Sequence, residues 1–229
     1  MISRLAGALL LTLIAAAVFA AGEGWRQVID QDGVVVSTRA VDGSDLDEFR
    51  GVVELAAPLA VVAAVVRDVP GHARWMDRTQ SGRVVRVVSE RSLILYHISN
   101  SPWPIRDRDL VTRRDETWEL DDRRVFFRFR AVEDSAMPPN EKYVRLSEVV
   151  SSWELVYLAP ERTRTIYTSR VHPGGAIPVI VANSQSKNVP FNTLRSLRRM
   201  VATAKYRRMG ESSPLARAVA EHFAAATPN

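Results

Sequence analysis

Hydrophobic and polar residues alternate along much of the chain between residues 34 and 172, the pattern of strands with one buried and one wet face. The alternation is clearest from Arg124 to Ala131, where Val125, Phe127 and Phe129 point one way and arginines the other. From residue 82 on, turn residues separate such segments without an intervening helical pattern, so we expect an antiparallel sheet. Strands are predicted at 34–39, 49–55, 82–89, 92–99, 109–120, 124–131, 143–157 and 163–172.

Four other segments are expected to be helical. Pro58 opens an apolar stretch, 59–66, that predicts a helix with proline in its first turn, and a further helical turn is expected at 73–77. After residue 175 apolar residues recur at every third or fourth position from Leu194 to Ala204, which indicates a long amphipathic helix. A last helix, 214–225, follows Ser212 and Ser213, either of which could cap it. Periodicity leaves open whether sheet and helix pack solidly or enclose a cavity.

The first twenty residues have the composition of a secretory leader. Arg4 carries a positive charge, and no charged residue occurs from Leu5 to Ala21. We predict a signal peptide at 1–20, cleaved after Ala20, and a periplasmic or secreted protein; an uncleaved anchor helix is the alternative. The rest of the chain divides into one domain, 21–210, and a helical tail, 211–229.

Composition narrows the chemistry. The chain has no cysteine, which excludes disulfides, thiolate metal sites and cysteine nucleophiles. Its four histidines have no metal-ligand spacing, and neither a Gly-x-Ser-x-Gly elbow nor a glycine-rich phosphate loop occurs. We therefore expect no metal or cofactor and assign no catalytic residue; acid–base catalysis by residues that form no motif stays an alternative. The net charge of +5 would suit nucleic acid or an anionic membrane, and export argues against nucleic acid.

Five motifs in register resemble the START domains, the lipid-transfer domains related to the steroidogenic acute regulatory protein. They are Trp75, the proline loop Tyr96 to Pro104, Arg106 to Val111, Met137 to Pro139 with Tyr143 to Arg145, and Gly175 to Pro178. The resemblance covers residues 25–208. It implies an α+β helix-grip fold, in which a curved antiparallel sheet of about nine strands wraps around a long C-terminal helix.

The resemblance also implies a function. A START-like protein would bind one lipid, sterol or hopanoid-like ligand in an internal tunnel gated by the C-terminal helix, without chemistry, and transfer it. The loop from Glu133 to Glu141 would share the gating. A cyclase or hydrolase of the same superfamily is the alternative from another class, and an interaction module with a filled core is the third.

Candidate ligand-binding residues lie on the predicted inner faces. The same residue types also build solid cores, so only volume separates a tunnel wall from a core. Polar groups for a ligand head would come from His97, Arg114 and the sheet serines Ser147, Ser151 and Ser169. The apolar candidates are Trp75, Tyr96, Trp118, Phe127, Phe129, Val149, Trp153, Tyr167, Leu194, Leu197 and Val201.

Arg114 departs from the family pattern. In animal members a similar arginine pairs with a buried carboxylate on the preceding strand, where this chain has His97 and Ile98. Arg114 is therefore either exposed and paired across the sheet, or buried against a carboxylate, water or the ligand head, because an unpaired buried guanidinium is costly.

The last long helix carries six Lys or Arg residues between Arg195 and Arg208, with no acid among them. This face is either an ordinary solvated surface or a contact for anionic lipid head groups.

Overall fold

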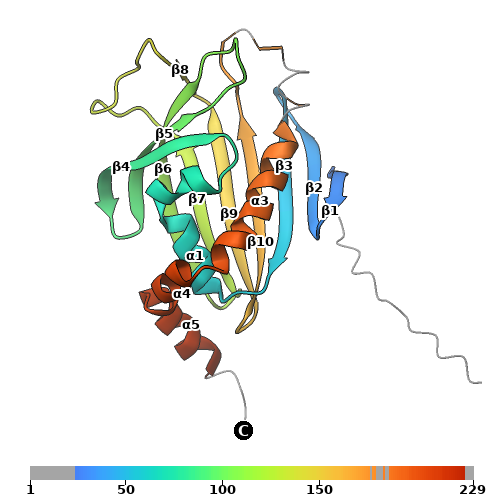
Figure 1. Cartoon of the computed structure of the whole chain (residues 1–229), viewed down its shortest axis with the longest axis vertical. Coiled ribbons are helices and arrows are strands. Elements are labelled where there is room, and N and C mark those ends of the chain that lie inside the picture. The colour runs from blue at the N-terminus through green and yellow to red at the C-terminus, as the bar shows by residue number, and fades with distance from the viewer. Residues whose placement is uncertain (1–23, 176, 179–182, 184–185, 225–229) are drawn as a thin grey trace, which may run out of the picture.

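A computed structural model of the chain describes residues 24–175, 177–178, 183 and 186–224 (Figure 1). The predicted signal peptide, 1–20, lies outside these residues. Ten strands form one curved, mainly antiparallel sheet in the order β1-β2-β3-β10-β9-β7-β6-β5-β4, and β8 pairs in parallel with β6 beside this path. The α+β fold is thus the one that the sequence predicts, with ten strands instead of about nine.

The helices cover the concave face and one end of the sheet (Figure 1). The helical elements are α1 (Leu59–Arg67), the 3-10 helix η1 (Val69–Arg74), α3 (Asn188–Val201), α4 (Ala204–Glu211) and α5 (Pro214–Ala224). The strands are β1 (Arg26–Gln31), β2 (Val34–Val41), β3 (Ser44–Leu55), β4 (Thr79–Ser89), β5 (Ser92–Ser99), β6 (Arg108–Glu119), β7 (Arg124–Ala131), β8 (Val144–Arg145), β9 (Val149–Ala159) and β10 (Arg162–Val171).

Helix α1 fills one half of the concave face. Each residue from Leu59 to Val66 is buried, so this helix is apolar all round, as expected for one enclosed by protein. It contacts β9 and β10 on one side and α3, α4 and α5 on the others. The half of the interior that contains α1 is therefore a solid core.

The predicted long C-terminal helix is two helices. Helix α3 ends at Val201, where Thr203 Oγ1 donates to Met200 O at 2.8 Å, and α4 starts at Ala204. Helix α3 crosses β3 at Gly51, where a Cβ atom would lie 2.7 Å from Leu194 Cδ1. Helix α4 approaches α1 equally closely, since a Cβ atom on Gly210 would lie 2.5 Å from Val61 Cα.

The C-terminal segment packs onto the domain. Leu215 is fully buried in the main core, and Phe223 stacks on Tyr157 with ring centroids 4.1 Å apart. Ser213 Oγ accepts a hydrogen bond from Ala216 N at 3.2 Å, which confirms the predicted cap. Helix α5 thus packs against the same core as the domain that precedes it.

The structure differs from the prediction at three further places. Strand β1 was not predicted, because Arg26–Gln31 has little apolar alternation. The predicted strand 143–157 is two strands, β8 and β9, since the chain leaves β6 at Leu146 before it joins β10. The helical turn expected at 73–77 begins instead at Val69 and ends at Arg74.

Candidate functional site

Two adjoining hollows lie in the half of the concave face that α1 leaves open. The outer one has a volume of about 270 Å³ and reaches the β5–β6 loop; the inner one has a volume of about 150 Å³ and extends to Trp153. They adjoin each other, because both are lined by Asp77, Ser99, Leu146, Tyr167, Val171 and Val189. The interior of this domain is therefore partly hollow.

The wall of the inner hollow contains six of the predicted ligand-binding residues. Trp153 and Tyr167 are neighbours on β9 and β10, and their rings stack with centroids 4.3 Å apart. Val189 and Thr193 of α3 close the opposite side, and Thr193 Oγ1 accepts from Asp77 N at 3.0 Å. The six are His97, Phe129, Val149, Ser151, Trp153 and Tyr167, and the predicted Ser169 lines the outer hollow.

Six predicted wall residues instead belong to the solid core or its edge, because α1 occupies the space that they face. Trp118 lies near the end of β6 and donates from Nε1 to Glu116 Oε1 at 2.5 Å. The other five are buried in the main core and line neither hollow: Trp75, Phe127, Leu194, Leu197 and Val201.

Tyr96 lies on the outer face of the sheet, so its prediction as a wall residue is wrong. Side chains alternate along a strand, and His97 takes the inner face. Tyr96 packs with Ile94 and Val111, and its hydroxyl donates to Asp109 Oδ2 at 3.0 Å. Burial, followed by the hydrogen bond to Asp109, raises the pKa of Tyr96 to about 12.

The loop from Glu133 to Glu141 also lies away from the cavity. Arg145 pairs with Asp109 at 2.8 Å and donates to Met137 O at 3.0 Å and Pro138 O at 3.2 Å. None of the described residues of this loop lines either hollow. These contacts tie the loop to the sheet, and they do not support the gating role predicted for it.

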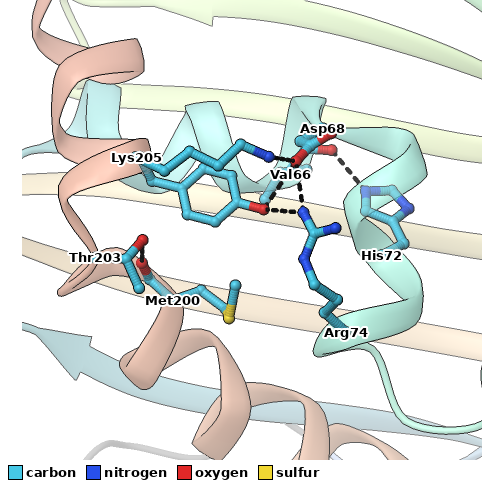
Figure 2. A network of polar contacts seen from close by, with 8 residues as sticks. Val66, Asp68, His72, Arg74, Met200, Thr203 and Lys205 are labelled. Carbon is cyan, nitrogen blue, oxygen red and sulfur yellow. Dashed lines mark hydrogen bonds and ion pairs between the residues drawn. The ribbon is translucent and has the colours of Figure 1, made fainter.

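A pair of buried histidines forms one end of the inner hollow. His72 Nδ1 lies 3.1 Å from His97 Nε2, and His72 Nε2 lies 2.9 Å from Val66 O (Figure 2 shows the contact with Val66). Desolvation lowers the pKa of His72 to about 4 and that of His97 to about 3. Both rings are therefore neutral at pH 7.

The histidine pair depends on a glycine in the next strand. Gly82 of β4 pairs with His97, and a Cβ atom there would lie 2.8 Å from both His97 Cδ2 and Val69 O. We expect Gly82→Ala to displace the His97 ring and to lower the free energy of unfolding by about 1–3 kcal/mol. Urea unfolding would measure the loss, with Ser81→Ala as the control on the same strand; equal stability of the two variants would contradict the contact.

Arg114 points inward, and the alternative in which it is exposed is wrong. Its side chain is buried at 4% exposure, and Nε and Nη1 are buried without a hydrogen-bond partner. Desolvation lowers the pKa of Arg114, while the charge of Glu116 opposes that shift. Arg114 lies beside the cavity residues Thr112 and Phe129 in the sheet but does not itself line either hollow.

The carboxylate near Arg114 comes from its own strand. Glu116 accepts from Arg67 Nε at 3.0 Å and from Arg67 Nη2, in addition to the bond from Trp118. Burial alone would raise the pKa of Glu116, but the hydrogen bonds and charge of Arg67 lower it. Two guanidinium groups and one ionised carboxylate thus share this part of the interior.

A second cluster of charges joins the C-terminal helices to α1. Asp68 accepts from Lys205 Nζ at 2.5 Å, Tyr206 Oη at 2.8 Å and Arg74 Nη2 at 3.2 Å (Figure 2). Burial alone would raise the pKa of Asp68, but hydrogen bonds from Lys205 and Tyr206 lower it. This cluster fixes α4 against the end of α1.

Acids from other elements pair with three of the six basic residues of this helix face, and a main-chain carbonyl accepts from a fourth. Arg195 lies 3.8 Å from Asp32 Oδ2, and Arg198 Nη1 donates to Asp32 O at 2.7 Å. Arg207 pairs with Glu161 at 3.0 Å, and Lys205 with Asp68. These contacts favour the interpretation of this face as an ordinary solvated surface.

Several residues that line the inner hollow were not predicted from the sequence. Thr112 alternates with Leu110 and Arg114 on the predicted strand and so shares a face with them. Its place in the wall could therefore have been predicted from the sequence. His72 and Asp77 come from η1 and the turn after it, and no periodicity indicates where such residues point. Across the described part of the chain no three His, Asp or Glu residues gather as metal ligands, and no helix there is long and apolar enough to cross a membrane.

Comparison with known proteins gives consistent results. The chain is 30% identical over 197 residues to an uncharacterized protein of Pseudomonas aeruginosa, covering 84% of this chain and 96% of that one. A STAR-related lipid transfer protein from Xanthomonas axonopodis is 30% identical with a TM-score of 0.72, over 79% of this chain and 100% of that chain. Human StAR-related lipid transfer protein 5 shares the fold at 19% identity and a TM-score of 0.71, over 80% of this chain and 88% of that one. The START domain model matches residues 11–207, and the chain therefore belongs to the START family.

Proposed function

We propose that this protein binds one apolar ligand in the adjoining hollows and carries it between membranes without altering it. The hollow interior supports this proposal most directly, because a filled core could hold no guest. The outer hollow opens between the β5–β6 loop and Pro173, and the inner hollow ends on Trp153, Phe129 and the histidine pair. An apolar chain with a small polar head fits this arrangement.

Selectivity would come from the polar end of the cavity. Removing a methylene from water contributes about 0.8 kcal/mol, whether the new surroundings are a bilayer or the cavity. The free energy gained by burying the apolar tail is therefore largely the same in the membrane and in the protein. The groups that distinguish ligands are His97, Thr112 and Ser151 in the wall, with the positive charge of Arg114 behind it.

The chemistry of the wall favours binding over catalysis. A general base needs a pKa near the working pH, and the pKa of His97 is lowered to about 3. Both nitrogens of His72 are already engaged. We therefore propose a non-enzymatic carrier over a cyclase or hydrolase, and the predicted secretory leader leads us to propose the periplasm or exterior as its location.

A re-isolation experiment tests the proposal. The purified protein would be incubated with vesicles of phosphatidylethanolamine and phosphatidylglycerol that also contain an uncharged long-chain alcohol, separated from them, and its extracted lipids quantified by mass spectrometry. We expect about one lipid per chain and net transfer to acceptor vesicles. Conversion of the lipid would support the enzyme alternative, and absence of bound lipid at all protein concentrations would contradict a carrier of membrane lipids.

The proposed membrane contact lies at the mouth of the cavity. Trp103 is 92% exposed and Ile105 37% exposed, both in the loop between β5 and β6. Ile105 and Pro102 line the outer hollow beside Arg108. An exposed indole ring is well suited to a membrane interface, so this loop would place the opening directly on the bilayer.

We expect Trp103→Ala to weaken vesicle binding about tenfold, because the change removes a large interfacial side chain from the proposed contact. Arg199→Ala on α3 is the matched surface control and should bind as the unaltered protein does. Co-sedimentation with neutral and anionic vesicles measures both. If Arg199→Ala weakens binding and Trp103→Ala does not, the contact lies on the C-terminal helices instead.

A further inference from the structure

The histidine pair has a fixed pattern of donors and acceptors. Val66 O can only accept, so Nε2 of His72 carries the hydrogen of that contact at 2.9 Å. The neutral His72 ring then offers a lone pair at Nδ1, and His97 Nε2, 3.1 Å away, must donate to it. The same count leaves Nδ1 of His97 without a hydrogen, as a pure acceptor.

The surroundings of His97 direct this acceptor away from β4. Gly82 lies against the Cδ2 and Nε2 atoms of the ring, because a Cβ atom on Gly82 would lie 2.8 Å from Cδ2 and 2.9 Å from Nε2. Nδ1 is on the opposite edge, toward β6, where His97 pairs with Leu110 and Thr112 follows on the same face. No described residue donates to Nδ1, and His97 lines the inner hollow.

Thr112 supplies a complementary group. The residue is 1% exposed and lines the inner hollow, and its Oγ1 has no hydrogen-bond partner. A diagonal pair on adjacent strands is close enough for one small group to contact both side chains. A hydroxyl group both donates and accepts, so it is the smallest group that satisfies an acceptor and a hydroxyl together.

We propose that the inner hollow selects an uncharged ligand with a hydroxyl group, which donates to His97 Nδ1 and accepts from Thr112 Oγ1. This inference rests on the proposed function and names the class of its ligand. A carboxylate has no hydrogen for Nδ1 and would place its charge against that lone pair. An ether accepts from Thr112 but leaves Nδ1 without a donor.

Three probes of similar size separate these cases at pH 7.5. They are 1-dodecanol, its isomer 1-methoxyundecane, which has no donor, and dodecanoate; each competes with the neutral fluorophore N-phenyl-1-naphthylamine. We expect 1-dodecanol to bind about tenfold more tightly than either of the others, the effect of one buried hydrogen bond. Equal affinity of the alcohol and the ether, or tighter binding of dodecanoate, would overturn the inference.

Variants assign the preference to the two residues. His97→Gln keeps a donor near His72 but removes the acceptor at the Nδ1 position, and Thr112→Val removes only a hydroxyl. Both should reduce the alcohol-to-ether ratio to within about twofold of one, and Thr112→Ser should retain it. Thr38→Val is the matched control, because Thr38 Oγ1 is also buried without a partner but does not line either hollow. If the ratio falls equally in Thr38→Val, the assignment is wrong.

The outcomes distinguish the two proposals. Should His97→Gln fail to fold, the unaltered protein and Thr112→Val still give the decisive ratios. Binding of all three probes with equal affinity would leave the carrier intact and remove the hydroxyl selectivity. Failure of the fluorophore and of every probe to bind would contradict the proposed function itself.

Discussion

Replacing Glu116 with alanine is expected to lower the free energy of unfolding by about 3–5 kcal/mol, the cost of breaking a buried ion pair from one side. Glu116 is 7% exposed and is the carboxylate that faces both Arg67 and Arg114. Without it, two guanidinium groups would remain near each other in a largely buried place. Arg114 already lacks partners for Nε and Nη1, so no described neighbour compensates.

Glu119→Ala is the matched control on the same strand, because its carboxylate is 42% exposed and lies 3.8 Å from Arg128. Exposed pairs of this kind contribute about 0–1 kcal/mol. Urea unfolding at pH 7.5 compares the two variants. A Glu116→Ala protein as stable as Glu119→Ala would show that the interior solvates these arginines and that the charge cluster is not buried in solution.

Stability is expected to fall as the pH is lowered from 6.5 towards 4, and the histidine pair is the cause. The pKa values of His72 and His97 in the folded protein are about 4 and about 3, against 6.5 for a free ring. In this window the unfolded chain binds more protons than the folded one, so acid favours unfolding. At pH 5 each ring accounts for a loss of about 2 kcal/mol relative to pH 7.5.

Urea unfolding at pH 7.5, 6 and 5 measures this loss. The charged groups that face the pair are Arg114 and Asp68, and neither titrates between pH 5 and 6.5. The double variant His72→Phe, His97→Leu should lose most of the dependence, while His222→Gln at the surface should keep it. An unchanged slope in the double variant would mean that the rings are protonated or exposed in the folded protein.

Much of the sheet could be predicted because its strands have one apolar and one polar face. In Arg124–Ala131 the alternation gave both the strand and its buried side, and Val125 and Phe127 are indeed fully buried. Strand β1 escaped because an edge strand with little burial needs no apolar pattern. The division of the long helix into α3 and α4 escaped because apolar spacing continues from Val201 to Ala204 across the break.

The site was only partly predictable, for a related reason. Alternation tells which residues face inward but not how far α1 extends along the concave face, and that extent separates Phe129 in the cavity wall from Phe127 in the solid core. Tyr96 and His97 are neighbours on one strand, so only one of them can face the cavity, and the sequence does not tell which. The contact between His72 and His97 joins η1 to β5, and no spacing in the sequence indicates it.

Ligand occupancy in a cavity-filling variant tests the central claim most directly. Ser151 lines the inner hollow, and its neighbour Val150 points outward at 51% exposure. Native mass spectrometry would count bound ligand in the unaltered protein, Ser151→Trp and Val150→Trp after equal exposure to the same vesicles. If the cavity is the binding site, the unaltered protein and Val150→Trp each hold one ligand and folded Ser151→Trp holds none; equal occupancy in all three would place the ligand elsewhere.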